Sequence, residues 1–302
     1  MAPMSSCVMP TEYGSGSRLP FSAMSATPQE HVDERNAQFW DELCGTALAR
    51  SIGITDHSDE SLRRFDEAYM ARYPYLPAQL RPPRRPGEPL LEIGLGYGTV
   101  SRRLAQAGFD YHGLDIAAGP VGMVRHHLGM LGIADAQHRV VVGSALEVPH
   151  PDGAFSHVVT IGCLHHTGDL PKAVSEVYRV LEPGGTAMVM LYNRYSFRQL
   201  VLRAKTFADR KMGRHEAADE RLRAAYDSNA EGHAAPETVF VTARQVRDEL
   251  FAPFSSVRVE HHNFDPTRLF VIGDRGIVFK REWALPTVAR LVGLDLYVHA
   301  RK

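Results

Sequence analysis

Glycines at alternate positions give the first indication of chemistry in this chain. Leu90–Thr99 reads LLEIGLGYGT, an apolar run containing Glu92 that is followed by Gly94, Gly96 and Gly98. Glycine lets the backbone approach a ligand closely. A helix that begins directly after such a turn presents unpaired N–H groups and the positive end of its dipole. The segment is therefore typical of a turn that cradles a nucleotide-like ligand.

The glycine spacing separates two kinds of nucleotide site. A dinucleotide-binding turn has the pattern G-x-G-x-x-G/A, whereas here the third glycine comes one position early and Thr99 stands where Gly or Ala is required. Asp115 ends the next apolar segment, and its two carboxylate oxygens are able to accept both hydroxyl hydrogens of a ribose. The pattern favours a nucleoside-type cofactor. A helix N-cap is the alternative role of Asp115.

Two later apolar segments also end in polar residues. His165 and His166 follow the segment 155–161, and Tyr192 and Asn193 end the segment that begins at 186. A neutral imidazole accepts a proton near pH 7, so either histidine is a candidate base, with a packing role as the alternative. Adjacent histidines point in different directions and do not form a metal-ligand pair. Tyr192 and Asn193 are candidates for contacting a substrate or for capping the strand end.

The elements that must position these residues alternate between strand and helix. We expect strands at 90–93, 111–116, 140–142, 155–161 and 186–192, and helices at 100–107, 120–131 and 170–181. Alternation of this kind predicts right-handed βαβ crossovers and a parallel sheet. Ligands of such sheets bind outside the carboxyl ends of the strands. The candidate residues all fall at that edge.

Helical patterns flank the alternating region. Helices are expected from Pro28 to a stop at Gly45 and from 58 to 73, followed by a proline-rich linker. Their aromatic side chains indicate either a small satellite core or a lid over a ligand, and the two are compatible. Further helices are expected at 197–211, 216–226, 241–251 and 285–291. Strands at 257–263 and 294–300 would close the sheet as a hairpin.

The ordered set of motifs resembles class I S-adenosylmethionine-dependent methyltransferases of the ubiquinone/menaquinone-like branch. The resemblance covers about residues 88 to 195 and rests on six segments: 92–98, Asp115, 143–149, 155–159, 164–166 and 178–185. It implies an α/β fold with a Rossmann-like, doubly wound, seven-stranded sheet and a terminal antiparallel hairpin. The implied cofactor is S-adenosyl-L-methionine.

The resemblance also implies roles for individual residues. The methionine and ribose end would be lined by Glu92, Gly94, Gly96 and Gly98, with Asp115 and Ile116 at the ribose. Ser144, Ala145 and Leu146 would flank the adenine, with Gly162 also at the cofactor. The family commonly has Asp where this chain has Ser144, and a hydroxyl accepts a hydrogen bond more weakly than a carboxylate. The N-terminal helices lie outside the resemblance; from their position we expect Tyr73 and Arg72 to close over the cofactor, and Tyr69 and Trp40, like Asn193, to contact the substrate.

The expected function is methyl transfer to a small-molecule acceptor, an amino-acid-derived or aromatic specialised metabolite. His165, His166 and Tyr192 are the candidate catalytic residues. Whether oxygen, nitrogen or carbon is methylated stays open. The alternatives are cyclisation of the cofactor's own aminobutyl arm, a nicotinamide-dependent oxidoreductase, and a protein that binds S-adenosylmethionine without transferring a methyl group.

The amino-acid composition and net charge limit the classes of binding partner that we expect. A net charge of −1 and a pI near 7.0 provide no electrostatic field for gathering nucleic acid or an anionic membrane. Three scattered cysteines imply neither a disulfide framework nor a metal site. No apolar run is long enough to span a bilayer, and the first 26 residues do not form a secretory signal. We therefore expect a cytoplasmic monomer or homodimer.

The expected domain organisation follows from these segments. Residues 1–27 form a disordered tail, 28–86 a helical lid and linker, and 87–302 the methyltransferase domain. Residues 194–236 interrupt the strand–helix alternation and are expected to form a helical cap over the substrate, because insertions at this sheet edge commonly carry binding contacts.

Overall fold

The computed structural model describes residues 27–42, 47–56, 58–81, 85–264 and 286–302. The predicted tail (apart from Thr27), the stop at Gly45, the centre of the proline linker and residues 265–285 lie outside these ranges.

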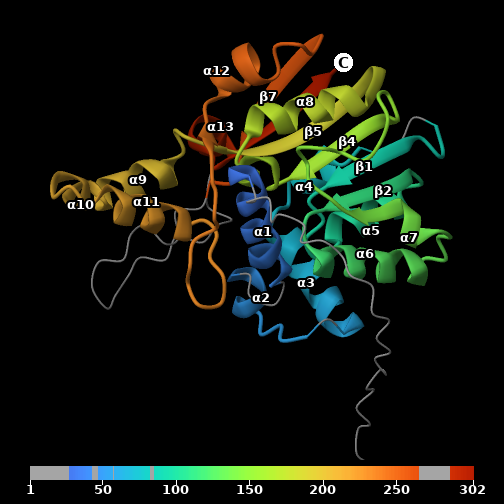
Figure 1. The fold of residues 1–302 in the computed structure, drawn as a ribbon, viewed down its shortest axis with the longest axis horizontal. Coiled ribbons are helices and arrows are strands. Elements are labelled where there is room, and N and C mark those ends of the chain that lie inside the picture. The colour runs from blue at the N-terminus through green and yellow to red at the C-terminus, as the bar shows by residue number, and fades with distance from the viewer. Residues whose placement is uncertain (1–26, 43–46, 57, 82–84, 265–285) are drawn as a thin grey trace, which may run out of the picture.

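A single twisted sheet forms the centre of the protein, with the strand order β3-β2-β1-β4-β5-β8-β7 (Figure 1). Its strands are β1 Pro89–Ile93, β2 Asp110–Asp115, β3 Val140–Val142, β4 Phe155–Ile161, β5 Leu181–Asn193, β7 Ser256–His262 and β8 Asp295–Arg301. The two-residue strand β6, Phe240–Val241, pairs with the end of β5 as an eighth member. Only β8 runs antiparallel, pairing with both β5 and β7. The predicted α/β fold with its closing antiparallel hairpin is confirmed.

Helices cover both faces of the sheet because the strands are apolar on both faces. On one face lie α5 Thr99–Gln106, α6 Ala118–Met130 and α7 Ala136–Arg139, and on the other α8 Leu170–Val180, α12 Ala243–Gln245 and the π-helical turn η3 Val246–Leu250 (Figure 1). Leu90 packs with the first group and its neighbour Leu91 with the second, as the two-residue period of a strand requires. The site edge is thus held between two hydrophobic cores.

The N-terminal helices pack beside the glycine turn. They are α1 Pro28–Asp41, α2 Ala47–Ser51, α3 Asp59–Arg72 and α4 Leu76–Gln79. Thr27 and Glu30 form a capping box with Pro28 in the first turn, which fixes the predicted start of α1. Phe65 of α3 stacks on Tyr97 of the glycine turn at 3.8 Å between ring centroids. The satellite core expected here therefore packs directly against the candidate site.

The insertion after β5 projects from one end of the molecule (Figure 1). It contains α9 Phe197–Lys205, α10 Phe207–Lys211 and α11 His215–Ala224; a further helix, α13 Pro286–Val292, precedes β8. The single helix predicted over 197–211 is wrong, since it is divided at Thr206, whose hydroxyl bonds the carbonyls of Leu202 and Arg203. Residues 183–185, which follow the helix predicted at 170–181, belong to β5, so that this strand begins before the predicted 186.

Candidate functional site

A cavity of about 720 Å³ opens at the carboxyl ends of the parallel strands. This is within the range of small-molecule binding sites. Most of the residues expected from sequence line it: Trp40, Tyr69, Arg72, Tyr73, Glu92, Gly94, Gly96, Asp115, Ile116, Ser144, Ala145, Gly162, His166 and Tyr192. Gly98, Leu146, His165 and Asn193 lie outside this lining. The tertiary structure therefore gathers side chains from the N-terminal helices, the strand ends and the insertion around one space.

The glycine turn follows β1 and approaches the segment after β4. Gly94 has φ +83°, and a Cβ there would lie 2.4 Å from the Cβ of Cys163. A Cβ on Gly96 would meet nothing within 4 Å, although Gly96 lines the cavity. Gly94 is thus required for packing, whereas Gly96 leaves open space for a ligand. Gly98 instead caps α5 in the left-handed conformation.

Asp115 fixes this turn through its side chain. One carboxylate oxygen accepts a hydrogen bond from the Leu95 N–H at 2.6 Å, and the other accepts from the Ala117 N–H at 2.9 Å. Burial raises the pKa of Asp115, and these backbone donors oppose the shift. The backbone N–H groups of Gly96 and Ile116 act on the pKa in the same direction as these donors. A carboxylate oxygen accepts more than one hydrogen bond, so a ribose hydroxyl is able to share Asp115 with the turn.

Glu92 lies buried at the end of β1, where Tyr111 donates a hydrogen bond to its Oε2 at 2.7 Å. Burial raises the pKa of Glu92 to about 8, with the charge of Asp115 adding to the rise and the Tyr111 hydrogen bond opposing it. The protonated carboxyl group is therefore the favoured form of Glu92 at pH 7.

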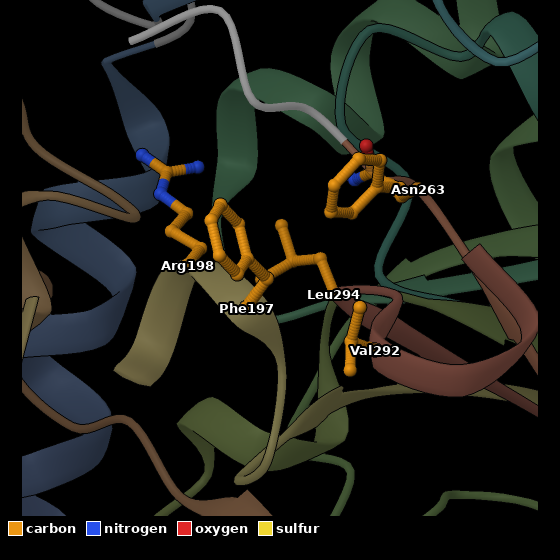
Figure 2. Close-up of a pocket in the computed structure, with 6 residues that line it drawn as sticks. Phe197, Arg198, Asn263, Val292 and Leu294 are labelled. Atoms are coloured by element: carbon orange, nitrogen blue, oxygen red, sulfur yellow. The ribbon is translucent and has the colours of Figure 1, made fainter. Parts of the chain in front are cut away.

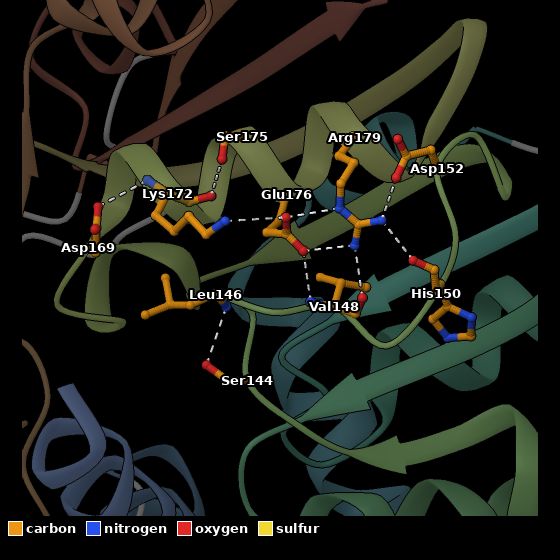
Figure 3. Close-up of polar contacts among 10 residues, drawn as sticks. All are labelled: Ser144, Leu146, Val148, His150, Asp152, Asp169, Lys172, Ser175, Glu176 and Arg179. Atoms are coloured by element: carbon orange, nitrogen blue, oxygen red, sulfur yellow. Dashed lines mark hydrogen bonds and ion pairs between the residues drawn. The ribbon is translucent and has the colours of Figure 1, made fainter. Parts of the chain in front are cut away.

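The segment expected to flank an adenine is held from behind by α8. Arg179 donates to the carbonyl oxygens of Val148 and His150 at 2.9 and 2.8 Å, while Glu176 accepts from the Val148 N–H at 2.9 Å (Figure 3). At the front of the same loop, the Ser144 hydroxyl accepts from the Leu146 N–H at 3.2 Å. One lone pair of the Ser144 hydroxyl oxygen is therefore occupied within the loop, and the hydroxyl hydrogen remains able to bond a ligand.

His166 faces the cavity with a defined tautomer. Its Nδ1 lies 2.6 Å from the Glu237 carbonyl oxygen, to which Thr238 also donates its hydroxyl hydrogen. Because a carbonyl oxygen only accepts, Nδ1 carries the proton and Nε2 presents a lone pair. Burial lowers the pKa of His166, opposed by the nearby Asp227. The neutral imidazole is thus the form expected at pH 7.

Asp227, which follows α11, completes this part of the cavity. Its Oδ2 lies 3.7 Å from His166 Nε2 and accepts a hydrogen bond from the Tyr192 hydroxyl at 3.0 Å. Burial raises the pKa of Tyr192 well above its ordinary value, so Tyr192 acts as a donor. Trp40 and Tyr226 flank the group, with ring centroids 4.9 Å from His166 and 5.1 Å from Tyr192.

Two of the predicted site residues, His165 and Asn193, do not line the cavity and contact other parts of the protein instead. The ring of His165 is fully buried and packs on Tyr192 at 4.1 Å between ring centroids, and its pKa is lowered well below the ordinary value by burial. Asn193 donates to the Gly293 carbonyl at 2.9 Å and accepts from the Tyr195 N–H at 3.0 Å. This contact pattern matches strand-end capping, the alternative considered for Asn193.

Sequence reasoning missed Asp227, Tyr226 and Asn36. The first two lie near the end of an insertion whose sequence has no recognisable motif, and Asn36 lies on α1. All three line the cavity. In the sequence, the only indication at 226–227 is an aromatic residue followed by an acidic one. This pair of residue types is too common in proteins to identify a binding site.

A second, much smaller cavity lies where the insertion meets the end of the sheet. It is lined by Phe197, Arg198, Asn263, Phe264, Val292 and Leu294, and Figure 2 shows side chains of α9 facing those of the β7–β8 end. Its volume of about 10 Å³ is no more than that of one water molecule. It is a packing gap at the base of the insertion.

Among the described residues, no group of three or more His, Cys, Asp or Glu side chains is arranged to hold a metal ion. The same part of the chain contains no helix long and apolar enough to cross a membrane.

Comparisons with known proteins agree with this geometry. A family profile described as a methyltransferase domain matches residues 91–189. These residues form a class I S-adenosylmethionine-dependent methyltransferase domain. The match begins in β1 and ends in β5, so that the glycine turn, Asp115 and both histidines lie within the methyltransferase domain, whereas Trp40, Asp227 and the N-terminal helices lie outside it.

Curated relatives of the methyltransferase domain act on different acceptors. The chain is 36% identical over 107 residues to malonyl-[acyl-carrier protein] O-methyltransferase of Serratia marcescens, covering 34% of this chain and 38% of that protein. It is 28% identical over 111 residues to phosphoethanolamine N-methyltransferase 2 of Caenorhabditis elegans, covering 36% and 25%. The matches thus span less than half the length of these relatives.

Solved structures resemble the fold over most of the chain. One of them, the methyltransferase solved in complex with the Haloferax volcanii Trm112 methyltransferase activator, has a TM-score of 0.52 and 17% identity, covering 81% of this chain and 95% of that chain. At this identity the likeness shows the fold alone.

S-adenosylmethionine is the cofactor of this family, and the residues present suit it. A Cβ-sized space at Gly96, a carboxylate at Asp115 and a buried carboxyl group at Glu92 surround one end of the cavity. They offer acceptors to ribose hydroxyls and to the cofactor's ammonium and sulfonium charges. The methyltransferase domain therefore fits the cofactor of its family.

Proposed function

We propose that this protein transfers a methyl group from S-adenosylmethionine to a small-molecule acceptor, a specialised metabolite of amino-acid-derived or aromatic type. The observation that carries the proposal is the continuity of one cavity from the glycine turn to the His166–Asp227 pair. The cofactor and a small methyl acceptor would both bind in this cavity, and aromatic side chains would surround the methyl acceptor.

The chain's own residues would have distinct roles. Asp115 and Gly96 would hold the ribose end, Ser144 and Ala145 would flank the adenine, and Arg72 would pair with the cofactor's carboxylate. The bound cofactor would supply an electrophilic methyl group on a sulfonium. His166 Nε2 would accept a proton from the acceptor, and the surrounding walls would align the reactants, which supplies much of the acceleration in such reactions.

The N-terminal helices and residues 194–236 would act as a lid and a cap. Phe65 stacks on the glycine turn, and Asp66 forms a hydrogen bond with Thr99 and an ion pair with Arg102 on α5, so that α3 is attached to the cofactor side. Asp227 and Tyr226 reach the cavity from the other side. In this proposal the protein acts in the cytoplasm as a monomer or homodimer, without nucleic acid or membrane as partner.

Calorimetric titration with S-adenosylmethionine and with NADH tests the cofactor. We expect S-adenosylmethionine to bind and NADH not to bind. Asp115→Ala is expected to weaken S-adenosylmethionine binding more than tenfold, about the loss of charge-assisted hydrogen bonds. Binding of NADH alone would overturn the proposal, and an unchanged affinity of Asp115→Ala would remove Asp115 from the site.

Mass spectrometry of the products tests the reaction. Incubation with S-adenosylmethionine and an extract of small metabolites is expected to give S-adenosylhomocysteine together with a product that is heavier by one methylene unit. Formation of 5′-methylthioadenosine from the cofactor alone would instead indicate cyclisation of the aminobutyl arm. Cofactor binding without either product would indicate a binding protein.

A further inference from the structure

The part of the cavity proposed to bind the methyl-accepting substrate contains two hydrogen-bond acceptors, which face each other without a donor between them. His166 Nε2 presents a lone pair, because Nδ1 donates to the Glu237 carbonyl, and Asp227 Oδ2 lies 3.7 Å away. Among the described residues, Nε2 has no hydrogen-bond partner, and His166 is only 3% exposed. Two acceptors at this separation repel each other unless a donor stands between them.

The structure assigns this pair to an acceptor substrate that carries at least two N–H bonds and a positive charge: a primary or secondary amine, bound as its ammonium ion. The assignment rests on the proposed function and names its substrate class. One N–H would donate to Asp227 Oδ2 and another to His166 Nε2. A hydroxyl acceptor has a single hydrogen and is able to satisfy only one of the two.

The charges around the pair favour a cation. The side chain that the structure places at ion-pair distance from Asp227 is that of His166, and its imidazole is neutral at pH 7 because burial lowers its pKa. The guanidinium of Arg198, which also lines the cavity, donates to the Ala225 carbonyl and lies over the Tyr226 ring at 4.7 Å. Asp227 is therefore available to compensate an ammonium charge.

The aromatic walls fit the same ligand. Trp40, Tyr192 and Tyr226 line the cavity around Asp227. Aromatic ring faces attract cations, and such enclosures combined with a carboxylate are suited to ammonium ions. Tyr192 donates to Oδ2 of Asp227, and a carboxylate oxygen is able to accept a second hydrogen bond.

The same geometry allows the amine to become a nucleophile. One ammonium N–H bond breaks, its electron pair stays on nitrogen, and the proton is bound by His166 Nε2. Asp227 then faces an imidazolium ion, so the separation of charge is compensated within the pair. His166 is the proton acceptor and Asp227 the residue that binds the charge.

Three probes that share a benzyl group separate the contributions of charge and N–H donors: benzylamine, benzyl alcohol and benzyltrimethylammonium. They are titrated into the full-length protein saturated with S-adenosylhomocysteine, with calorimetry and quenching of tryptophan fluorescence as readouts. We expect benzylamine to bind at least tenfold more tightly than benzyl alcohol, since a charge-assisted hydrogen bond is lost in the alcohol. Benzyltrimethylammonium, which has the charge but no N–H, is expected to lie between them.

Asp227→Asn keeps the shape and the hydrogen bond from Tyr192 but removes the charge. It is expected to weaken benzylamine binding about tenfold and to leave benzyl alcohol binding within a factor of two. Glu220→Gln, on an exposed side chain of α11 in the same insertion, is the matched control and should change neither.

Two results would overturn the assignment: benzyl alcohol binding as tightly as benzylamine, or Asp227→Asn leaving benzylamine affinity unchanged. Failure of benzylamine to bind to protein that still binds S-adenosylhomocysteine would also overturn it, without affecting the proposed methyl transfer. Failure of the protein to bind S-adenosylmethionine or S-adenosylhomocysteine would contradict the proposed function instead. Circular dichroism of each variant checks that the fold is retained.

Discussion

The side-chain amide of Asn36 donates a hydrogen bond to the main-chain carbonyl oxygen of His166 at 2.8 Å. Asn36 is buried in the middle of α1, 130 residues away in the chain, so this bond connects the N-terminal helices to the segment that carries the candidate base. Two further contacts lie at the ends of α1: Gln29 donates to the Thr167 carbonyl at 2.9 Å, and Asp41 accepts from the Gly119 N–H at 2.6 Å.

Asn36→Ala is expected to loosen α1 from the domain. It leaves the His166 carbonyl without this donor and removes a buried amide, which should lower the free energy of unfolding by about 1–2 kcal/mol. Hydrogen–deuterium exchange should become several-fold faster in α1 and stay unchanged in α5. Gln38→Ala, at an exposed position of the same helix, is the control. Equal exchange in the two variants would show that Asn36 does not attach α1.

The two glycines of the turn should respond differently to alanine. Gly94→Ala places a Cβ 2.4 Å from that of Cys163 at a φ of +83°, so we expect a loss of stability of about 2–4 kcal/mol or failure to fold. Gly96→Ala meets no neighbour and should cost only about 1 kcal/mol for its positive φ, while its methyl group lowers S-adenosylmethionine affinity at least tenfold. Thermal unfolding and calorimetry measure the two effects, and the opposite ranking would contradict them.

The buried carboxyl group of Glu92 should make the free energy of unfolding depend on pH. Its pKa is about 8 in the folded protein, against an ordinary value of 4.5 for a Glu carboxyl group. The folded protein therefore holds one more proton between these values, and stability falls as the pH rises through this window, by roughly 2–4 kcal/mol. Glu92→Gln keeps an acceptor for Tyr111 and should be less sensitive to pH than the unmodified protein.

Thermal unfolding at pH 5.5 and pH 8.5 measures this difference. The pKa of Asp115 is also raised by burial, so some dependence of the same sign remains in Glu92→Gln. Glu147→Gln, at an exposed side chain, serves as control. Identical pH profiles for Glu92→Gln and the unmodified protein would show that Glu92 ionises normally.

Arg179 should support the adenine side without touching it. Arg179→Lys loses the planar fork that bonds two loop carbonyls and Glu176 together, so we expect about 1–3 kcal/mol less stability and a several-fold weaker binding of S-adenosylmethionine (Figure 3). Lys172→Ala removes a half-exposed pair with the same Glu176 at 3.6 Å and should cost less than about 0.5 kcal/mol. Denaturant unfolding and calorimetry compare the two variants.

Local patterns in the sequence determined the order of elements and the cofactor end of the site. Runs of apolar and β-branched residues predicted 140–142 and 155–161 with the bounds that the structure has, because such residues favour a pleated, partly buried surface. The early third glycine and Asp115 indicated a nucleoside cofactor because backbone approach and ribose recognition each need particular residue types at short range. Longer helices were less well predicted, since Thr206 ends α9 through a side-chain bond that propensity does not show.

Only the tertiary structure decided which of the two adjacent histidines faces the cavity and what stands opposite it. The sequence allowed either His165 or His166, and the choice depends on the turn after β4, where His165 packs under Tyr192 and His166 is fixed by the Glu237 carbonyl. Asp227 meets His166 because the insertion folds back over the sheet edge. Contacts between residues 61 positions apart, made by a segment with no periodic constraint, leave no pattern in the sequence from which they could be predicted.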